Sequence, residues 1–288
     1  MPNHFFSQNG LTACCTDTSI TLFWDKPAAA GAVGTYTVLL DDAVAAHTEK
    51  THCTLGSLRP ETAYSLFVQW RSGSIGELNV QTTPTKRDLD VTAAPYFAVG
   101  DGKTMNTAAL QKAIDDCGEQ ERVWFPAGIY RTGALRLHSN MEIFLEEGAV
   151  LQGTADPEDY LPRIPSRFEG TEMECYSSLL NLGTLDHTAG PNCENVILRG
   201  KGTIASGGKL LAERIIARER ERLKDYLAQN VALVSTCENA DTIPGRVRPR
   251  LVNMSNCRNI WMEGLTFANG ASWNLHMIYS DQIVTDHC

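Results

Sequence analysis

The first 87 residues alternate apolar and polar side chains in short runs. One run covers residues 19–24 and a second covers residues 35–40, and this period of two is that of a half-buried strand. Small residues and glycine indicate a loop between them at residues 27–34. Short strands with turn signals every ~10 residues are typical of two packed sheets. The pattern predicts a β-sandwich over residues 1–87 that ends in a short, proline-containing linker at residues 82–88.

After the linker, the periodicity changes to that of a helix. Residues 104–117 place Leu110 and Ile114 on one apolar face, and Thr104 or Asn106 can cap the start of the helix. The end of a strand solenoid exposes unpaired backbone groups. We therefore expect this amphipathic helix to cover such an end.

Three asparagines share one register along the rest of the chain. Asn140, Asn195 and Asn259 each precede apolar residues at the first and third following positions. Asparagine tolerates a left-handed corner, and alternate apolar side chains can fill the bore of a coil. The asparagines are 55 and 64 residues apart, whereas Gln282 follows Asn259 after 23. The pattern predicts a β-solenoid over residues 88–288 whose coils carry insertions.

The largest insertion has helical periodicity over residues 209–227. Two pairs of opposite charge, Glu219 with Arg222 and Glu221 with Lys224, lie three positions apart on its polar side. We interpret this charge run as a solvated helix face rather than a nucleic-acid patch; the alternative role is to wall off one end of a groove. The predicted apolar face consists of Ala212, Ile215, Ile216, Leu223, Tyr226 and Leu227.

Composition narrows the class of protein. The 288 residues carry a formal charge of −9 and are 43% hydrophobic, which is typical of an acidic globular protein and speaks against nucleic acid as a partner. The N-terminus has no basic segment followed by an apolar run, and no stretch is apolar enough to cross a membrane. Nine cysteines without a C-x-x-C pair indicate free thiols in the cytoplasm, with secretion as the alternative. No metal or cofactor is indicated, and the oligomeric state stays open.

The N-terminal region resembles fibronectin type III domains. The segment Leu58-Arg-Pro-Glu-Thr-Ala-Tyr64 fits their L-x-P-x-T-x-Y pattern, and Trp24 and Tyr36 match their core tryptophan and the strand that follows it. In such domains the tyrosine hydroxyl bonds back to nearby backbone at a corner between the sheets. The resemblance covers residues 12–87 and implies that these aromatic residues form core, with carbohydrate contact as the alternative.

The remaining chain resembles the pectin-degrading glycoside hydrolases of family 28, the polygalacturonases. Residues 101–107 fit their opening pattern D-G-x-T-x-N-T, and residues 248–276 read as successive strands that end in W-x-x-H at residues 273–276. The resemblance covers residues 91–288. It implies an all-β fold, a small fibronectin type III-like β-sandwich followed by a right-handed parallel β-helix that is incomplete at its C-terminus.

The resemblance also implies an activity, the inverting hydrolysis of α-1,4-galacturonide bonds in pectin or its oligomers, with exo action as one mode. Members of the family use the aspartates of an N-x-D segment and a D-D pair, followed by G-H-G and R-x-K. One carboxyl group protonates the leaving oxygen, while another activates water on the opposite face of the sugar.

This catalytic series does not occur in the family's order within the chain. D-D pairs occur at residues 41–42 and 115–116, N-x-D occurs at residues 239–241, and G-H-G is absent. We interpret these acids as turn and helix residues and assign no catalytic residue. The catalytic coils are expected beyond residue 288, and the 288-residue chain alone is predicted to be inactive.

Three residues are candidates for binding a galacturonide oligosaccharide or pectin. Trp273 can stack on a sugar face, while His276 and Arg250 can each reach a carboxylate. The alternatives are that Trp273 fills the bore, that His276 is a satisfied corner residue, and that Arg250 and Arg248 form structural salt bridges.

Two other classes of function fit less well. The β-helix can also serve as a non-catalytic carbohydrate-binding or adhesin module. The reading frame beyond residue 288 distinguishes the two hypotheses, because only the hydrolase requires the catalytic series there. A calcium-dependent lyase would need a cluster of acids on one face, and the sequence shows no such cluster.

Overall fold

The structure is a computed structural model that describes residues 5–27, 34–71, 73–188 and 190–288. The chain divides into two compact units, Met1–Arg87 and Asp88–Cys288, and each has an apolar core of its own. The predicted loop at residues 27–34 lies largely outside the described residues, as do the first four residues of the chain.

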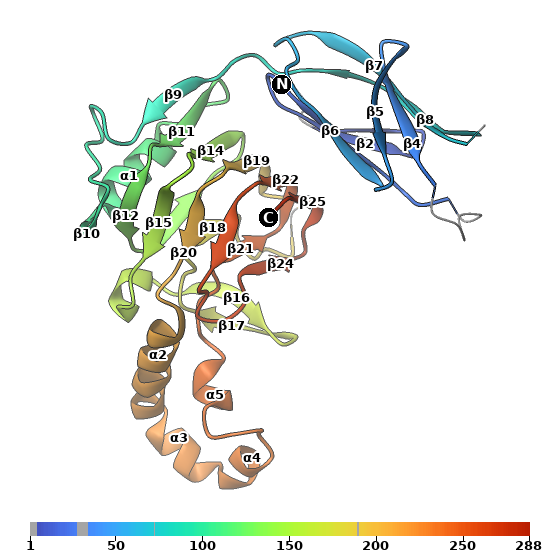
Figure 1. Ribbon diagram of the computed structural model, residues 1–288. Coiled ribbons are helices and arrows are strands. Elements are labelled where there is room, and N and C mark those ends of the chain that lie inside the picture. The colour runs from blue at the N-terminus through green and yellow to red at the C-terminus, as the bar shows by residue number, and fades with distance from the viewer. Residues whose placement is uncertain (1–4, 28–33, 72, 189) are drawn as a thin grey trace. The chain divides into compact units, whose positions relative to one another are not determined.

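Two antiparallel four-stranded sheets form the N-terminal unit, shown in blue in Figure 1. Leu22 and Val38 come from different sheets, and both are fully buried in the shared core. The two strands predicted from alternation are confirmed. In sheet order, the strands are β1 (Phe5–Gln8), β2 (Leu11–Cys15), β3 (Ile20–Trp24) and β6 (His52–Leu55), then β5 (Ala43–Thr48), β4 (Tyr36–Leu40), β7 (Ala63–Trp70) and β8 (Gly73–Gln81).

Aromatic residues of this unit lie where the sequence places them. Trp24 is buried and its ring meets that of Tyr36 edge to face at 5.2 Å. The Tyr64 hydroxyl accepts a hydrogen bond of 3.0 Å from the backbone N–H of Arg59. The tyrosine therefore fixes the backbone at the start of its own strand, as the L-x-P-x-T-x-Y pattern predicts.

The linker is shorter than the seven residues predicted for it. Thr82 and Thr83 are buried in the N-terminal unit, and the Thr82 hydroxyl donates to the carbonyl oxygen of Arg59 at 2.6 Å. Strand β9 (Arg87–Asp90) begins immediately after residue 86. Only residues 84–86 lie between the buried Thr83 and the start of β9.

In the C-terminal unit, successive strands belong in turn to three sheets that surround one apolar core, so that the chain advances as a coil (Figure 1). Neighbouring coils pair in parallel. The first sheet contains β9, β11 (Glu121–Phe125), β14 (Met141–Leu145), β19 (Cys193–Gly200), β22 (Cys257–Glu263) and β25 (Asp281–Asp286); the second contains β10 (Asp101–Met105), β12 (Gly128–Thr132), β15 (Ala149–Gly153), β20 (Thr203–Ala205) and β23 (Thr266–Ala268); the third contains β13 (Leu135–Leu137), β18 (Leu180–Leu182), β21 (Val252–Ser255) and β24 (Leu275–Ile278).

The predicted asparagines form a ladder at one corner of the coils. Asn140, Asn195 and Asn259 have φ values of 62°, 59° and 55°. The side-chain amide of Asn195 donates to Asn140 at 2.8 Å, and that of Asn259 donates to Asn195 at 3.0 Å. Gln282 occupies the next corner with φ 53°. The shared register predicted from sequence is confirmed.

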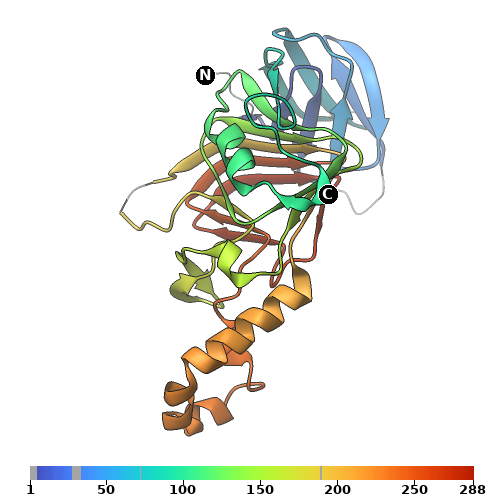
Figure 2. The ribbon, with the colours of Figure 1, turned by 90° about the vertical axis from the view of Figure 1, so that its left-hand side faces the viewer.

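The predicted helix covers one end of the coils as α1 (Thr107–Asp115) (Figure 2). Leu110 and Ile114 are fully buried in the core of the coil. Asn106 occupies the cap position, but its side chain accepts from the backbone N–H of Val99 at 2.7 Å and does not bond to the helix. Asp101 holds the preceding turn by accepting from the N–H of Thr104 at 2.7 Å.

Two insertions join the second sheet to the third. The first contains a short 3-10 helix (Pro157–Tyr160) and an antiparallel hairpin of β16 (Ile164–Phe168) and β17 (Thr171–Cys175). The second contains α2 (Gly208–Arg222), α3 (Lys224–Gln229), α4 (Val231–Ser235) and α5 (Thr242–Gly245). Both ribbon views show these helices extending away from the coils (Figures 1 and 2).

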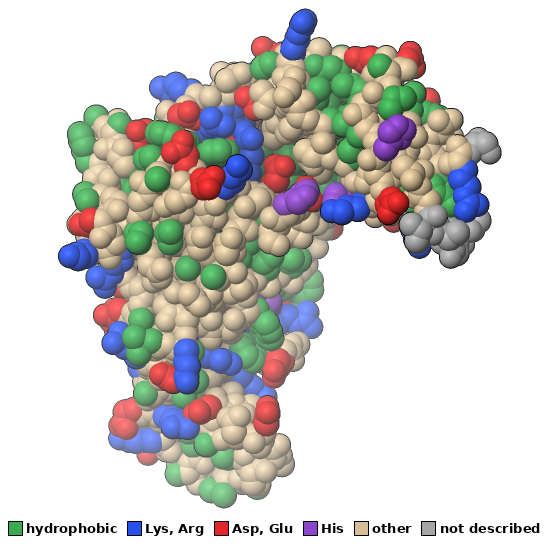
Figure 3. Space-filling view, in the orientation of Figure 1, with side chains coloured by type: hydrophobic (Ala, Val, Ile, Leu, Met, Phe, Trp, Pro, Cys, Tyr) green, Lys and Arg blue, Asp and Glu red, His purple; other side chains and the backbone are tan. Residues whose placement is uncertain are grey.

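The helical insertion corrects two details of the sequence analysis. The helix breaks at Leu223, and Tyr226 is 46% exposed instead of packing on an apolar face. Glu219 does pair with Arg222 at 2.8 Å, but its carboxylate is fully buried because Arg163 and the Tyr176 hydroxyl enclose it from the other side. Elsewhere on the helices, acidic and basic side chains are interspersed on the surface (Figure 3).

All nine cysteines are free thiols, as expected. Burial raises the pKa of Cys15 to about 12. Within the part of the chain that the structure describes, no helix has the length and apolar character needed to cross a membrane.

Candidate functional site

One row of side chains crosses the third sheet from strand to strand. Arg136, Asn181, Asn253 and His276 are register partners on β13, β18, β21 and β24. In the first three strands the row lies between apolar positions that are buried in the bore, such as Leu135 and Leu137 around Arg136. Because side chains alternate along a strand, the row belongs to the outer face of the sheet.

The hairpin of β16 and β17 is fastened over this face. The Ser166 hydroxyl donates to Asn253 at 3.3 Å, and the carbonyl oxygen of Arg167 accepts from Arg250 at 2.5 Å. Near the start of β17, the Glu172 carboxylate accepts from the Tyr279 hydroxyl at 2.9 Å. These contacts join the hairpin to two successive coils of the third sheet.

A hollow of about 740 Å³ lies beside the hairpin, over the β13 side of the row. Its basic lining residues are Arg136, His138 and Arg163. No Asp or Glu is among the described residues that line it, although the chain carries a net charge of −9. The remaining lining residues are uncharged, and the polar ones include Asn181, Thr184, Asn192, Asn253 and Ser255.

The three basic residues of the hollow differ in how they are engaged. Arg163 forms an ion pair with the buried Glu219, and its guanidinium lies 4.6 Å from the centre of the Tyr176 ring. His138 contacts the backbone carbonyl oxygens of Ser139 and Ile114, each at 2.8 Å. Arg136 is exposed, and only its backbone has hydrogen-bond partners, both on Gln111, among the contacts of the described residues.

Aromatic rings dominate the β24 side of the row. Trp273 is 42% exposed, so the alternative that it fills the bore is wrong. Its ring stacks on His276 at 5.3 Å and 14°, and it meets Phe168 of the hairpin at 4.9 Å. The exposed indole is therefore held in place by two rings.

Arg250 lies behind these rings and is only 1% exposed. Its guanidinium lies 5.1 Å from the centre of the Phe168 ring and 5.5 Å from that of Trp273, and it donates to the carbonyl oxygens of Arg248 and Arg167. Arg248 likewise donates to carbonyl oxygens. The salt-bridge alternative is wrong for both arginines, because carbonyl oxygens and aromatic faces take the place of carboxylates among the described residues.

His276 is satisfied, but it lies within β24 and not at a corner of the coil. Its Nδ1 is 3.1 Å from Oδ1 of Asn253, which also accepts from Ser166. Burial, with Arg250 and Arg167 nearby, lowers the pKa of His276 to about 4. The imidazole is therefore neutral at pH 7, with the proton on Nδ1, and Nε2 can accept from a sugar hydroxyl. This tautomer does not favour the carboxylate contact that the sequence suggests.

Each motif match from the sequence analysis has a structural role. Asp41 and Asp42 form a turn with positive φ, and Asp116 pairs with Lys112 at the end of α1. Asp241 pairs with Arg220 in the helical insertion. These placements agree with their interpretation as turn and helix acids.

R-x-K was expected to be absent, but the chain has two such tripeptides outside the family's order, at residues 199–201 and 222–224, and both are structural. Arg199 of residues 199–201 donates to the buried Glu142 at 2.5 Å. Lys224 of residues 222–224 pairs with Glu221 at 2.6 Å, as predicted.

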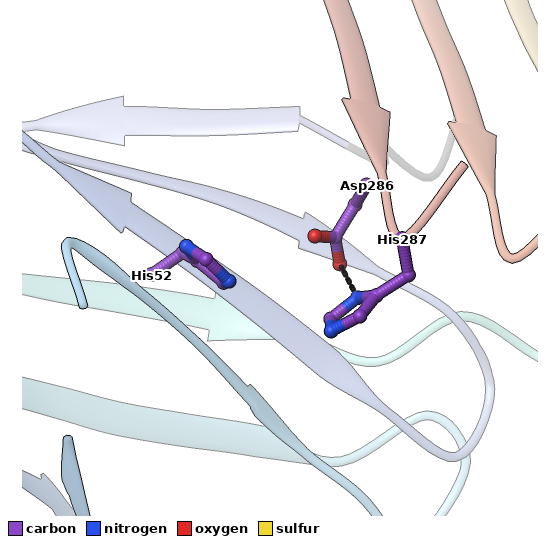
Figure 4. A group of neighbouring side chains, drawn as sticks. All are labelled: His52, Asp286 and His287. Atoms are coloured by element: carbon purple, nitrogen blue, oxygen red, sulfur yellow. Dashed lines mark ion pairs between the residues drawn. The ribbon is translucent and has the colours of Figure 1, made fainter. Parts of the chain in front are cut away.

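The acids of the last strand are paired as well. Asp281 pairs with Arg258 at 2.8 Å, and this hydrogen bond lowers the pKa of the Asp281 carboxyl group. Asp286 is buried, and its carboxylate lies 3.0 Å from Nδ1 of His287 (Figure 4). Neither residue is among the lining of the hollow.

Sequence reasoning missed Arg136 and Phe168. Arg136 lies in the three-residue strand β13, which is too short for its alternation to be read. Phe168 belongs to the hairpin, where the polar segment Glu169-Gly170 was the available turn signal.

Three parallel sheets around one apolar bore define a parallel β-helix, and the row of register partners and the rings lie on the outer face of its third sheet. No family model matches the chain. Two proteins are similar to it in sequence: it is 31% identical over 220 residues to an exo-poly-α-D-galacturonosidase of Dickeya chrysanthemi and 27% identical over 224 residues to a probable polygalacturonase of Vitis vinifera. The alignments cover 71% and 74% of this chain. The chain spans 36% and 39% of the length of these relatives.

Solved structures give the same fold. A family 28 exopolygalacturonase of Yersinia enterocolitica superposes with a TM-score of 0.73 at 22% identity, over 95% of this chain and 57% of that one. An exopolygalacturonase of Thermotoga maritima superposes with a TM-score of 0.52 at 24% identity, over 69% and 45%. Both of these structural neighbours are exopolygalacturonases.

Proposed function

We propose that these residues form the N-terminal part of a family 28 polygalacturonase-like glycoside hydrolase that acts on galacturonide bonds in pectin or its oligomers. The observation that carries the proposal is the outer face of the third sheet. There a half-exposed Trp273 and a basic hollow, which no acid lines among the described residues, follow one row of register partners. The 31% identity to the Dickeya galacturonosidase supports the same substrate class. No Asp or Glu is among the described residues that line the hollow, so the role proposed for this face is to bind the substrate.

Three residues are proposed to shape the sugar site. Trp273 offers an indole face for stacking on a sugar ring, because two neighbouring rings hold it in place. His276 accepts from a sugar hydroxyl through Nε2. Arg250 is buried, so it contributes a positive field beneath Trp273 instead of a direct surface contact.

The exo mode is proposed from the activity named for the Dickeya relative. None of the described residues lining the hollow comes from the helical insertion. Strand β16 of the hairpin, together with residues 183–185 and Asn192, borders the hollow instead. The hairpin is therefore better placed than the helices to close one end of the hollow.

For the N-terminal unit we propose a fibronectin type III-like domain over residues 1–87, followed by the β-helix over residues 88–288. The Tyr64 corner and the Trp24–Tyr36 contact support this assignment.

The cellular compartment that we propose is the cytoplasm. The free cysteines support it, because thiols stay reduced there.

The experiment that tests the function is calorimetric titration of the chain with oligogalacturonate and with neutral galactose oligomers. Trp273→Ala is expected to weaken oligogalacturonate binding roughly fivefold, because a stacking face is lost. Tyr226→Ala is the matched control, since Tyr226 is a similarly exposed aromatic residue on the helical insertion.

Binding of oligogalacturonate that is equal in the wild type and in Trp273→Ala would remove Trp273 from the site. Failure of the wild-type chain to bind any galacturonide would overturn the proposed substrate class.

A further inference from the structure

The basic hollow and the Trp273 ring occupy opposite sides of one row. Arg136 and His276 are separated by three strand spacings of about 4.8 Å, roughly 14 Å in all. This distance exceeds one sugar ring. A ligand that reaches both must therefore be an oligomer.

Arg136 is the basic group of the hollow that is best suited to bind an anion. Arg163 already neutralises the buried Glu219, and both ring nitrogens of His138 contact carbonyl oxygens. The guanidinium of Arg136 has no ion pair or hydrogen bond among the contacts of the described residues, whereas the backbone of Arg136 is fixed by two bonds to Gln111, each of 2.9 Å.

The surroundings favour a carboxylate over a neutral group. A guanidinium binds a planar carboxylate with two parallel N–H···O bonds, and such charge-assisted bonds are stronger than neutral ones. With no described acid lining the hollow, a bound carboxylate meets no like charge there. Asn181, Asn192 and Thr184 add polar lining suited to sugar hydroxyls.

We propose that Arg136 binds the carboxylate of a uronate residue located three strand spacings from His276, so that the hollow selects acidic oligomers long enough to reach it. This inference rests on the proposed function, because it assumes that the same oligomer passes Trp273. Arg136 is thereby a specificity-determining residue for length and charge.

The test compares Arg136→Gln with the matched control Arg131→Gln, which removes the same charge from the neighbouring β12 and lies outside the lining of the hollow. Digalacturonate, pentagalacturonate and the methyl ester of pentagalacturonate serve as titrants at low ionic strength. Arg136→Gln is expected to weaken pentagalacturonate binding roughly tenfold. It should leave digalacturonate and the ester unchanged, and Arg131→Gln should resemble the wild type.

A second readout is the Nε–H signal of Arg136 in a nitrogen-15 spectrum, assigned by its loss in Arg136→Gln. Pentagalacturonate is expected to shift this signal, and digalacturonate is not. Equal pentagalacturonate affinity in the wild type and in Arg136→Gln overturns the inference while leaving the proposed function intact. A wild-type chain that binds no galacturonide overturns both the inference and the proposed function. Equal weakening by Arg136→Gln and Arg131→Gln shows a general charge effect and also overturns the inference.

Discussion

The asparagine ladder shows how a single side chain can join neighbouring coils. The side-chain amides of Asn195 and Asn259 each donate to the amide oxygen of the preceding asparagine, but Oδ1 of Asn259 is buried without a partner among the described residues. Gln282 occupies the next corner with suitable φ. Its side chain is one methylene longer than the ladder requires.

Gln282→Asn is therefore expected to stabilise the protein. The new amide can donate to Oδ1 of Asn259 and satisfy a buried acceptor, a gain of about 1 kcal/mol. Thermal unfolding should show a higher Tm, whereas Gln120→Asn, at an exposed position, should show none. An unchanged Tm for Gln282→Asn would mean that the ladder ends at Asn259.

His276 gives a pH dependence with a definite sign. Its pKa is about 4 in the folded protein and near 6.5 when unfolded. The unfolded chain therefore binds more protons between these values, and the stability that neutral His276 contributes is lost as pH falls from 6.5 to 4. His276→Gln should reduce the fall in Tm over this range relative to the wild type, whereas parallel curves would contradict the depressed pKa.

At the scale of elements, the coil was more predictable than its insertions. The corner asparagines and the alternating apolar residues report the coil directly, because bore and corner impose the same requirements on each turn. The hairpin of β16 and β17 depends on contacts with strands 80 or more residues away, such as that of Ser166 with Asn253. No local pattern contains this information.

The residues of the candidate site likewise differ in whether the sequence could identify them. Trp273 and His276 belong to a recognisable segment and could be identified, whereas Arg136 could not, because its partners across the sheet come from three different coils. Arg250 was identified, but its burial was not foreseen, since Phe168 of the hairpin covers it.

Helix α2 is anchored to the first insertion by one buried carboxylate. Glu219 contacts Arg163, Arg222 and the Tyr176 hydroxyl. Removing it by Glu219→Ala should lower the free energy of unfolding by about 3 kcal/mol, at the low end for a broken buried pair because both arginines are partly exposed.

The control for this prediction is Glu213→Ala, whose carboxylate is exposed and lies 3.6 Å from Lys209. Its removal should change the free energy of unfolding by no more than about 0.5 kcal/mol. Denaturant melts of both variants give the comparison. Equal effects would show that Glu219 is not an anchor.

At the scale of the molecule, two units with separate cores are joined by a short connection at residues 84–86. Residues 84–86 belong to no helix or strand, so a protease can reach the backbone there. Brief trypsin treatment is expected to cut after Lys86 or Arg87 and to release two folded fragments, which mass spectrometry and circular dichroism can identify. Cleavage confined to the helical insertion would instead show that the connection is protected.

The regular coil also suggests how the outer row of the third sheet changes in evolution. Asn253 and His276 are 23 residues apart along the chain yet adjacent across the sheet, as are Asn259 and Gln282 at the corner. Duplicating one such 23-residue segment would lengthen the outer row by a single position while preserving the bore and the corner. Descent by gain or loss of whole turns would thus alter the reach of the surface in steps of about 4.8 Å, without redesign of any side chain already in place.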